Sequence, residues 1–103
     1  MRAPACRRES EITRAILEYL RAAGVMAWKN WSGPMTPIRG IADILGILPG
    51  GRFLAVEVKT PRGRLTEHQE RFLEQVRRHG GTALVARSVD DAIDLIRSLE
   101  GKR

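Results

Sequence analysis

The sequence predicts an α/β fold, a mixed β-sheet flanked by helices in the order α-β-β-β-α-β-α. Three segments carry apolar residues at helical spacing, and short segments rich in β-branched and aromatic residues lie among them. Gly and Pro residues separate the two kinds of segment. Because the chain has only 103 residues, it has room for one domain with one core.

The first helix is expected over residues 9–23, where apolar residues recur at helical spacing and Gly24 follows as a stop. Residues 25–31 follow as a strand, because they are β-branched and aromatic and precede a turn cluster. Residues 32–40 contain several Gly and Pro residues and are interpreted as a loop that carries Arg39.

A β-hairpin is expected next. Residues 41–48 form an apolar run interrupted only by Asp43 and Gly46, and residues 52–59 are rich in Phe, Leu and Val. The Pro-Gly-Gly segment 49–51 makes a tight turn between them. Each of these neighbouring strands therefore carries an acid among apolar residues.

The last three elements are a helix, a strand and a helix. Thr66 is expected to cap a helix that runs to about His79, and Gln69 completes the capping-box pattern Thr-x-x-Gln. Residues 82–87 are a short strand, and Ser88 is expected to cap the last helix. Residues 1–8 are interpreted as a basic, disordered lead-in and residues 9–99 as the single domain.

The charge balance favours a polyanionic partner. A net charge of +6 and a pI near 10.7 are well above neutrality for so short a chain. Nucleic acid fits this balance best, and a merely soluble basic surface is the alternative. No basic amphipathic helix with a Trp or Phe stripe is present to anchor the chain to a membrane.

The single cysteine, Cys6, can form neither an internal disulfide nor a thiolate zinc site. We therefore expect a reducing, cytoplasmic setting, with the protein associated with the nucleoid and a phage or prophage gene as one possible source.

Glu57 and Lys59 lie at the end of the third predicted strand. Side chains alternate across a strand, so Glu57 and Lys59 point to one side and Val58 enters the other. A buried carboxylate and ammonium in this position need a reason. One explanation is a structural ion pair between edge residues, and the other is a catalytic centre.

Asp43 in the neighbouring strand favours the catalytic interpretation. Two converging carboxylates repel each other unless a cation joins them. Mg²⁺ takes oxygen ligands, so Asp43 and Glu57 are candidate ligands and the backbone carbonyl of Val58 is a third. Lys59 could orient or deprotonate the attacking water, or neutralise charge on a phosphate.

The first helix offers a further acid. Glu9 lies near the inward stripe of the helix, whereas Glu11 turns away from it, so Glu9 is the better candidate to reach the sheet. The alternative is that Glu9 only stabilises the first turn against the helix dipole.

These motifs resemble those of one known family. Glu9, the segments Gly-Ile-Ala-Asp at 40–43 and Gly-Arg-Phe-Leu-Ala-Val-Glu-Val-Lys at 51–59, and Gly-x-Leu-Thr-x-x-Gln at 63–69 look like the successive motifs of the VRR-NUC family, a branch of the PD-(D/E)xK nucleases. The resemblance covers about residues 9–96. Ala42 stands where family members commonly have proline.

The resemblance implies a restriction-endonuclease-like fold and a phosphodiesterase that depends on Mg²⁺ or Mn²⁺. It implies that Asp43 and Glu57 bind the metal, that Lys59 assists the water, and that Glu9 and Gln69 complete the site. Short members of the family resemble Holliday-junction resolvases, which implies a homodimer that acts on branched DNA.

Several further residues fit a DNA surface. Candidate contacts on the approach to Asp43 are Lys29, Asn30, Ser32 and Arg39, with Trp28 and Trp31 beside them for an unstacked base. The alternative is that one tryptophan is core and the other an interface anchor. Arg62 and Arg64 follow Lys59 and are candidate phosphate contacts. Arg71, Arg77 and Arg78 of the second helix are interpreted as its solvated face.

The sequence therefore predicts a metal-dependent, structure-selective DNA endonuclease that hydrolyses phosphodiester bonds, with four-way junctions as a candidate substrate. One alternative is a catalytically inactive DNA-binding module in which the acids are structural. Another is a subunit that lends its sheet edge to a replication or repair complex.

Overall fold

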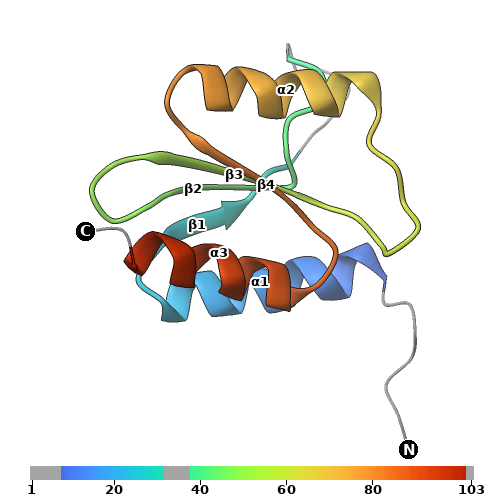
Figure 1. Cartoon of the computed structure of the whole chain (residues 1–103). Helices are drawn as coiled ribbons and strands as arrows, with labels where there is room; N and C mark the ends of the chain where they lie inside the picture. The colour runs from blue at the N-terminus through green and yellow to red at the C-terminus, as the bar shows by residue number, and fades with distance from the viewer. Residues whose placement is uncertain (1–7, 32–37, 102–103) are drawn as a thin grey trace, which may run out of the picture.

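The computed structural model describes residues 8–31 and 38–101 (Figure 1). They form three helices and four strands in the predicted order α-β-β-β-α-β-α. In chain order the elements are α1 (Glu9–Ala22), β1 (Met26–Lys29), β2 (Ile44–Ile47), β3 (Phe53–Val58), α2 (Glu67–Arg78), β4 (Thr82–Ala86) and α3 (Val89–Glu100). The predicted fold class is confirmed.

The four strands make one mixed sheet in the order β1-β2-β3-β4. β1 pairs antiparallel with β2, and β2 pairs antiparallel with β3 across the glycine turn. β4 pairs parallel with β3, and α2 makes the crossover between them. β3 is therefore an interior strand, with β2 on one side and β4 on the other.

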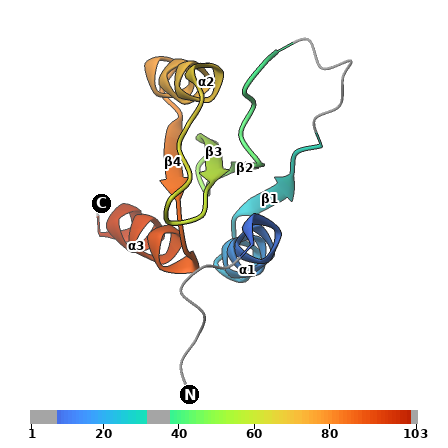
Figure 2. The same ribbon diagram turned by 90° about the vertical axis from the view of Figure 1, so that its right-hand side faces the viewer.

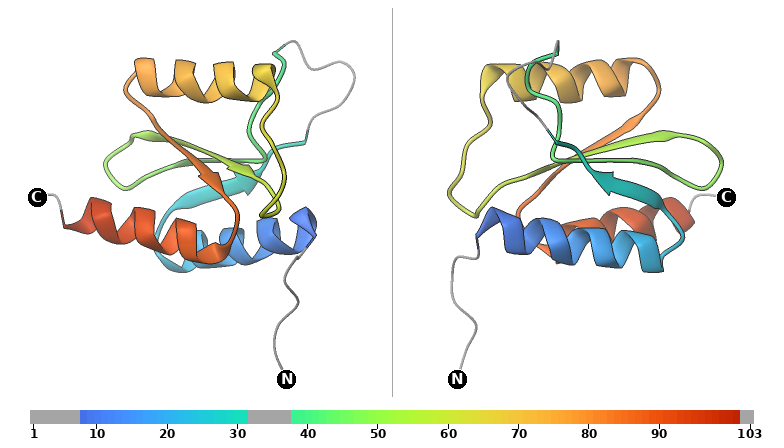
Figure 3. Two further views of the ribbon diagram at one scale, coloured as in Figure 1. Left: turned by 45° about the vertical axis from the view of Figure 1, so that its right-hand side comes forward. Right: turned by 180° about the vertical axis from the view of Figure 1, so that it is seen from behind.

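The helices cover the two faces of the sheet unequally. Figure 2 shows α1 and α3 beneath the sheet and α2 above it, and both views in Figure 3 show α1 and α3 side by side. The larger core lies on the α1 and α3 side and includes Ile16, Leu20, Ile44, Leu54 and Val56. The smaller core, on the α2 side, contains Ala42, Ala55, Leu73 and Val76.

Local signals set the ends of the first two helices. α1 stops before Gly24, whose φ of +88° lies in the left-handed region that glycine adopts without strain. The predicted capping box of α2 is present, since the Thr66 hydroxyl accepts from the Gln69 N–H at 3.1 Å. The side-chain Oε1 of Gln69 accepts in turn from the Thr66 N–H at 2.9 Å.

Three local predictions need correction. β2 begins at Ile44, so Asp43 lies in a bend just before the strand rather than within it. β3 ends at Val58, which leaves Lys59 one residue beyond the strand. Ser88 occupies the N-cap position of α3, but its side chain makes no capping hydrogen bond. Residues 1–7 of the predicted lead-in, with Cys6, and residues 32–37 of the predicted loop lie outside the described residues.

Candidate active site

Asp43 is fixed between two strands at one end of the sheet. Its Oδ2 accepts a hydrogen bond from the Val58 N–H at 2.8 Å, which ties the carboxylate to the end of β3. Its backbone oxygen accepts from the Asn30 N–H at 2.7 Å, which continues the β1–β2 ladder beyond the strands. Although Asp43 lies outside β2, these two bonds hold it beside the last residues of β3.

Glu57 is the buried acid of this site. It is 2% exposed, and its Oε1 is a buried side-chain oxygen without a hydrogen-bond partner among the described residues. Burial is the largest effect that raises the pKa of Glu57, to about 8. The charge of Asp43 and a hydrogen bond with it raise this pKa further, and the charge of Lys59 opposes them. Asp43 and Glu57 therefore converge.

Lys59 completes a group of three charged side chains. Its Nζ lies 3.8 Å from Glu57 Oε2, and the two side chains are 12% and 3% exposed. The ion pair considered as the structural alternative is therefore present, although it lies at the end of an interior strand rather than on an edge strand. Two carboxyl groups meet one ammonium here, so ionisation of both leaves negative charge at this end of the sheet, where a cation would be stabilised.

The carbonyl of Val58 lies on the correct side to contribute an oxygen. The N–H and C=O of one strand residue project toward the same neighbouring strand. Since the Val58 N–H points at Asp43 and the Lys59 N–H points at Ala86 of β4, the Val58 carbonyl projects toward the Asp43 side. The donor set that this end of the sheet presents is thus two carboxylates and one backbone carbonyl, which suits a hard cation.

The structure distinguishes the two acids of α1. The charge of Glu9 contributes to raising the pKa of Glu57, as the last of its causes. Glu11 instead accepts the Arg8 N–H at 3.2 Å and caps its own helix. Within residues 8–31 and 38–101, no three His, Cys, Asp or Glu side chains lie close enough together to hold a metal. Glu9 therefore lies near the carboxylate pair without forming a third ligand in this arrangement.

Gln69 lies close to the segment that delivers Asp43. Gly40 has a φ of +76°, and a Cβ there would lie 2.3 Å from the backbone C and O atoms of His68 and 2.6 Å from the Gln69 N. The segment before Asp43 thus packs directly against the first turn of α2. The side-chain Oε1 of Gln69 accepts the capping-box hydrogen bond, so its described contact is structural.

Arg87 braces the turn after Lys59, and sequence reasoning missed it. Its Nη1 donates to the carbonyl oxygens of Thr60 at 2.8 Å and Gly63 at 2.6 Å. The position of a Cβ at Gly63 would lie 3.4 Å from Lys59 Cδ, so the braced turn packs on the lysine stem. No sequence signal indicates this contact, because more than 20 residues separate Arg87 from the turn.

Comparison with known proteins identifies the family of the chain. The sequence model of the VRR-NUC domain family matches residues 3–90, which is most of the chain. The chain belongs to the VRR-NUC family, a family of nuclease domains. The chain is also similar to a solved VRR-NUC domain structure, with a TM-score of 0.71, 29% identity, and coverage of 86% of this chain and 94% of that one.

A second solved structure, of a VRR-NUC domain protein, has a TM-score of 0.70 and 19% identity and shows the shared fold. That match covers 89% of this chain and 87% of the other. No curated protein sequence matches the chain.

The predicted DNA contacts of this VRR-NUC domain separate into two groups. Arg39, Arg62 and Arg64 are exposed, on the segments that lead to Asp43 and away from Lys59. Lys29 is also exposed but lies toward α1, where it lines a hollow with Arg14 and Arg21. The contact of all four residues with DNA stays a prediction. Ser32 lies outside the described residues.

The structure also tests the predictions made for the two tryptophans and for the arginines of α2. The interpretation of one tryptophan as core is wrong, because Trp28 is 37% exposed and Trp31 is 82% exposed. Arg71 and Arg78 pair with Glu67 and Glu74 on the exposed side of α2, as expected of a solvated face. Asn30, a predicted DNA contact, donates its backbone N–H to the Asp43 carbonyl oxygen.

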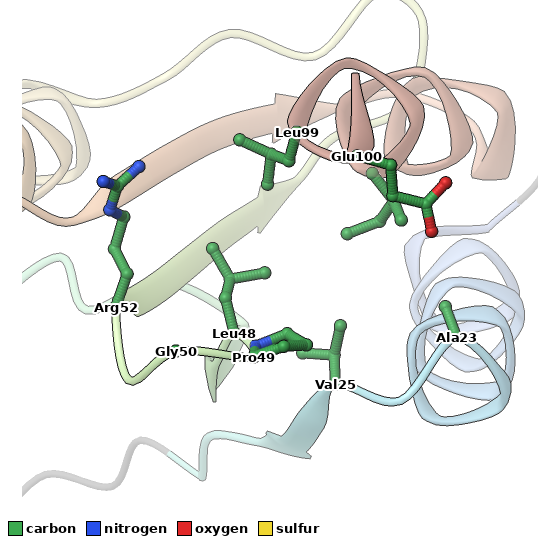
Figure 4. A pocket seen from close by; sticks show the side chains of 9 residues that line it. Ala23, Val25, Leu48, Pro49, Gly50, Arg52, Leu99 and Glu100 are labelled. Atoms are coloured by element: carbon green, nitrogen blue, oxygen red, sulfur yellow. The ribbon is translucent and has the colours of Figure 1, made fainter. Parts of the chain in front are cut away.

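An apolar hollow of about 500 Å³ lies at the other end of the VRR-NUC sheet (Figure 4). Leu48 and Pro49 at the β2–β3 turn, Val25 before β1 and Leu99 of α3 line it, and Arg52 and Glu100 contribute its charged groups. Its lining contains none of the site residues described above. None of the helices in the described parts of the chain is long and apolar enough to cross a membrane.

Proposed function

We propose that this protein is a DNA endonuclease that depends on Mg²⁺ or Mn²⁺ and hydrolyses phosphodiester bonds in branched DNA. The observation that carries the proposal is the convergence of Asp43 and Glu57, with a buried Glu57 oxygen that has no hydrogen-bond partner among the described residues. A divalent cation between the two carboxylates would remove their repulsion and supply that missing partner.

Asp43, Glu57 and the Val58 carbonyl are the groups that would hold the ion. When bound, such an ion activates water and neutralises a phosphate oxygen. Lys59 Nζ, 3.8 Å from Glu57 Oε2, would orient the attacking water or stabilise the charge that develops on the phosphate. Glu9 adds negative charge from α1, and Gln69 fixes the start of α2 beside the Asp43 segment.

The first test is a cleavage assay with labelled single-stranded, duplex, flap and four-way-junction DNA in Mg²⁺ or Mn²⁺. We expect cleavage of the branched substrates, and we expect EDTA, Asp43→Asn and Lys59→Ala each to reduce the rate at least about 100-fold. The control is Glu74→Gln, which removes an exposed carboxylate on the far side of α2. Cleavage by the Asp43→Asn protein at the rate of the unchanged protein would refute the site.

Two related expectations belong to the same proposal. A homodimer is expected from the family resemblance, and sedimentation equilibrium with and without four-way-junction DNA tests it. The inactive DNA-binding module is distinguished by calorimetry with Mn²⁺ alone, because only a catalytic site needs the carboxylates to bind the metal. Mn²⁺ binding that Glu57→Gln abolishes would support the enzyme, and salt-sensitive DNA binding without Mn²⁺ binding would support the module.

A further inference from the structure

One half of the sheet face on the α2 side has no helix over it. α2 packs on β3 and β4, and Figure 2 shows β1 and β2 without a helix on that side. Apolar side chains are exposed there: Met26 is 64% exposed, and Trp28, Ile47 and Phe53 are 37–38% exposed. We call these four residues the open apolar face. An exposed cluster of this kind marks a binding surface more often than scattered apolar residues do.

The pairing of the strands places this face directly beside the carboxylates. Met26 lies opposite Ile47, which lies opposite Phe53, so these residues form one row across three strands. Trp28, Leu45 and Ala55 form the next row.

The third row is the active site. Asn30 bonds to Asp43, and Asp43 lies beside the end of β3 that carries Glu57. Rows on one side of a sheet are about 7 Å apart, so Trp28 lies about one row from Asp43.

The outer edge of each terminal strand carries one arginine hydrogen bond. Arg21 of α1 donates from Nε to the Ala27 carbonyl of β1 at 3.1 Å. Arg77 of α2 donates to the Ala83 carbonyl of β4 at 3.3 Å. These carbonyls lie on the outer edges of the two terminal strands, which a pairing strand would need. A strand that pairs at either edge would therefore have to displace an arginine first.

A protein partner fits this face poorly. A stable interface covers about 800 Å² on each partner, so a protein seated on Trp28 would extend over the carboxylate row one step away. A second copy would also bring a second net charge of +6. A nucleic acid strand meets neither difficulty. It carries the opposite charge to the protein, and in the proposed reaction it has to reach the row of carboxylates.

We propose that Trp28 stacks on an unpaired nucleobase next to the cleaved phosphate, with Met26 extending the apolar surface. The inference rests on the proposed function for the position of the phosphate. Successive nucleotides advance about 3.4 Å along a stacked strand, so the distance of one row corresponds to about two nucleotides. The face therefore selects substrates with an unpaired base within about two nucleotides of the cleaved bond.

The test measures binding without cleavage. Fluorescence anisotropy in EDTA compares a duplex that contains a short unpaired gap with a fully paired duplex of the same length. We expect Trp28→Ala to weaken binding of the gapped duplex about 10-fold and binding of the paired duplex less than 2-fold. Trp28→Phe keeps an aromatic face and should retain most of the affinity. Equal losses on both substrates, or no loss on the gapped one, would overturn the proposal.

A second measurement needs no change at Trp28. In a Trp31→Phe protein, Trp28 is the sole tryptophan, and its fluorescence should be quenched by the gapped duplex and not by the paired one. An unquenched signal at saturating gapped DNA would overturn the proposal, as would a Trp28→Ala protein that loses self-association in sedimentation. Quenching in a protein that cleaves nothing would leave the stacking proposal standing and refute only the nuclease proposal.

Discussion

At the scale of single residues, Glu57 has a free-energy cost that the described side chains do not offset. Its carboxyl group is buried beside a second carboxylate, and one of its oxygens has no hydrogen-bond partner among the described residues. Lys59 is nearby but 3.8 Å from the other oxygen. Below its pKa of about 8 the group avoids the cost by remaining protonated, and a bound cation would replace that proton.

The raised pKa of Glu57 predicts how stability varies with pH. Without metal, folded Glu57 holds its proton up to about pH 8, whereas in the unfolded chain it loses the proton near pH 4.5. The unfolded state therefore binds fewer protons between these values, and the free energy of unfolding should fall as pH rises through this window. Glu57→Gln removes this titration, so its gain in stability should grow with pH, to at least about 1 kcal/mol at pH 8.

Thermal unfolding in EDTA at pH 5 and pH 8 measures this effect. A gain of about 1 kcal/mol corresponds to a rise of about 4–8 °C in Tm for a domain of this size. Glu70→Gln, on the exposed side of α2, is the matched control and should show no pH-dependent gain. A Glu57→Gln variant that gains the same stability at both pH values would contradict the assignment.

Arg87 is predicted to act through Lys59. Arg87→Gln removes the bonds that hold the turn against the lysine stem, so the ammonium should lose its fixed position. We expect kcat to fall about 10-fold or more with little change in DNA affinity, and Arg87→Lys to recover part of the loss. The decisive measurement is a double-mutant cycle, because Arg87→Gln should have little effect on kcat in a Lys59→Ala background. Additive losses would show that Arg87 contributes only to stability.

At the scale of secondary-structure elements, the approach of the Asp43 segment to α2 depends on Gly40. A Cβ at this position would meet backbone atoms, which cannot move aside as a side chain does. Gly40→Ala should therefore lower the free energy of unfolding by at least about 2 kcal/mol. Gly50→Ala is the matched control, since Gly50 has a similar positive φ of +99° with open space around it. Denaturant unfolding that shows equal losses would refute the packing argument.

Local patterns predicted the elements well and the long-range contacts poorly. Alternation along β3 was enough to place Glu57 and Lys59 on one side of the sheet and Val58 on the other. The start of β2 was misplaced, because the bend at Asp43 is fixed by bonds to Asn30 and Val58, which no local pattern contains. Local patterns also failed to predict the hydrogen bonds of Arg87 and the open apolar face, because both depend on which strands become neighbours.

The arginine hydrogen bonds at the sheet edges bear on the interaction-subunit alternative. Arg21 and Arg77 each bond a carbonyl on the outer edge of a terminal strand. A subunit that lends its edge to a partner would first have to displace one of these arginines. This arrangement favours partners that bind the sheet face.

At the scale of the whole molecule, the net charge of +6 attracts DNA without selecting where on the surface it binds. The position of the arginines decides which of them can contact phosphates near the site. Around the carboxylates the surface arginines are Arg39, Arg62 and Arg64, all exposed on connecting segments. Those on the outer side of α2 are partly neutralised by glutamates one helical turn away. The number of basic side chains that contact DNA phosphates is therefore expected to be smaller than the net charge alone suggests.

The salt dependence of DNA binding should distinguish these two groups of arginines. Each phosphate contact releases condensed counterions, so Arg62→Ala and Arg64→Ala should each reduce the slope of log affinity against log salt by about 1. Arg78→Ala removes the same charge but breaks only an exposed pair with Glu74, and it should leave the slope nearly unchanged. Affinities for one four-way junction in EDTA at 50–200 mM salt measure all three. If the three variants reduce the slope equally, DNA binding follows net charge alone, and the arginines beside Lys59 have no special place in it.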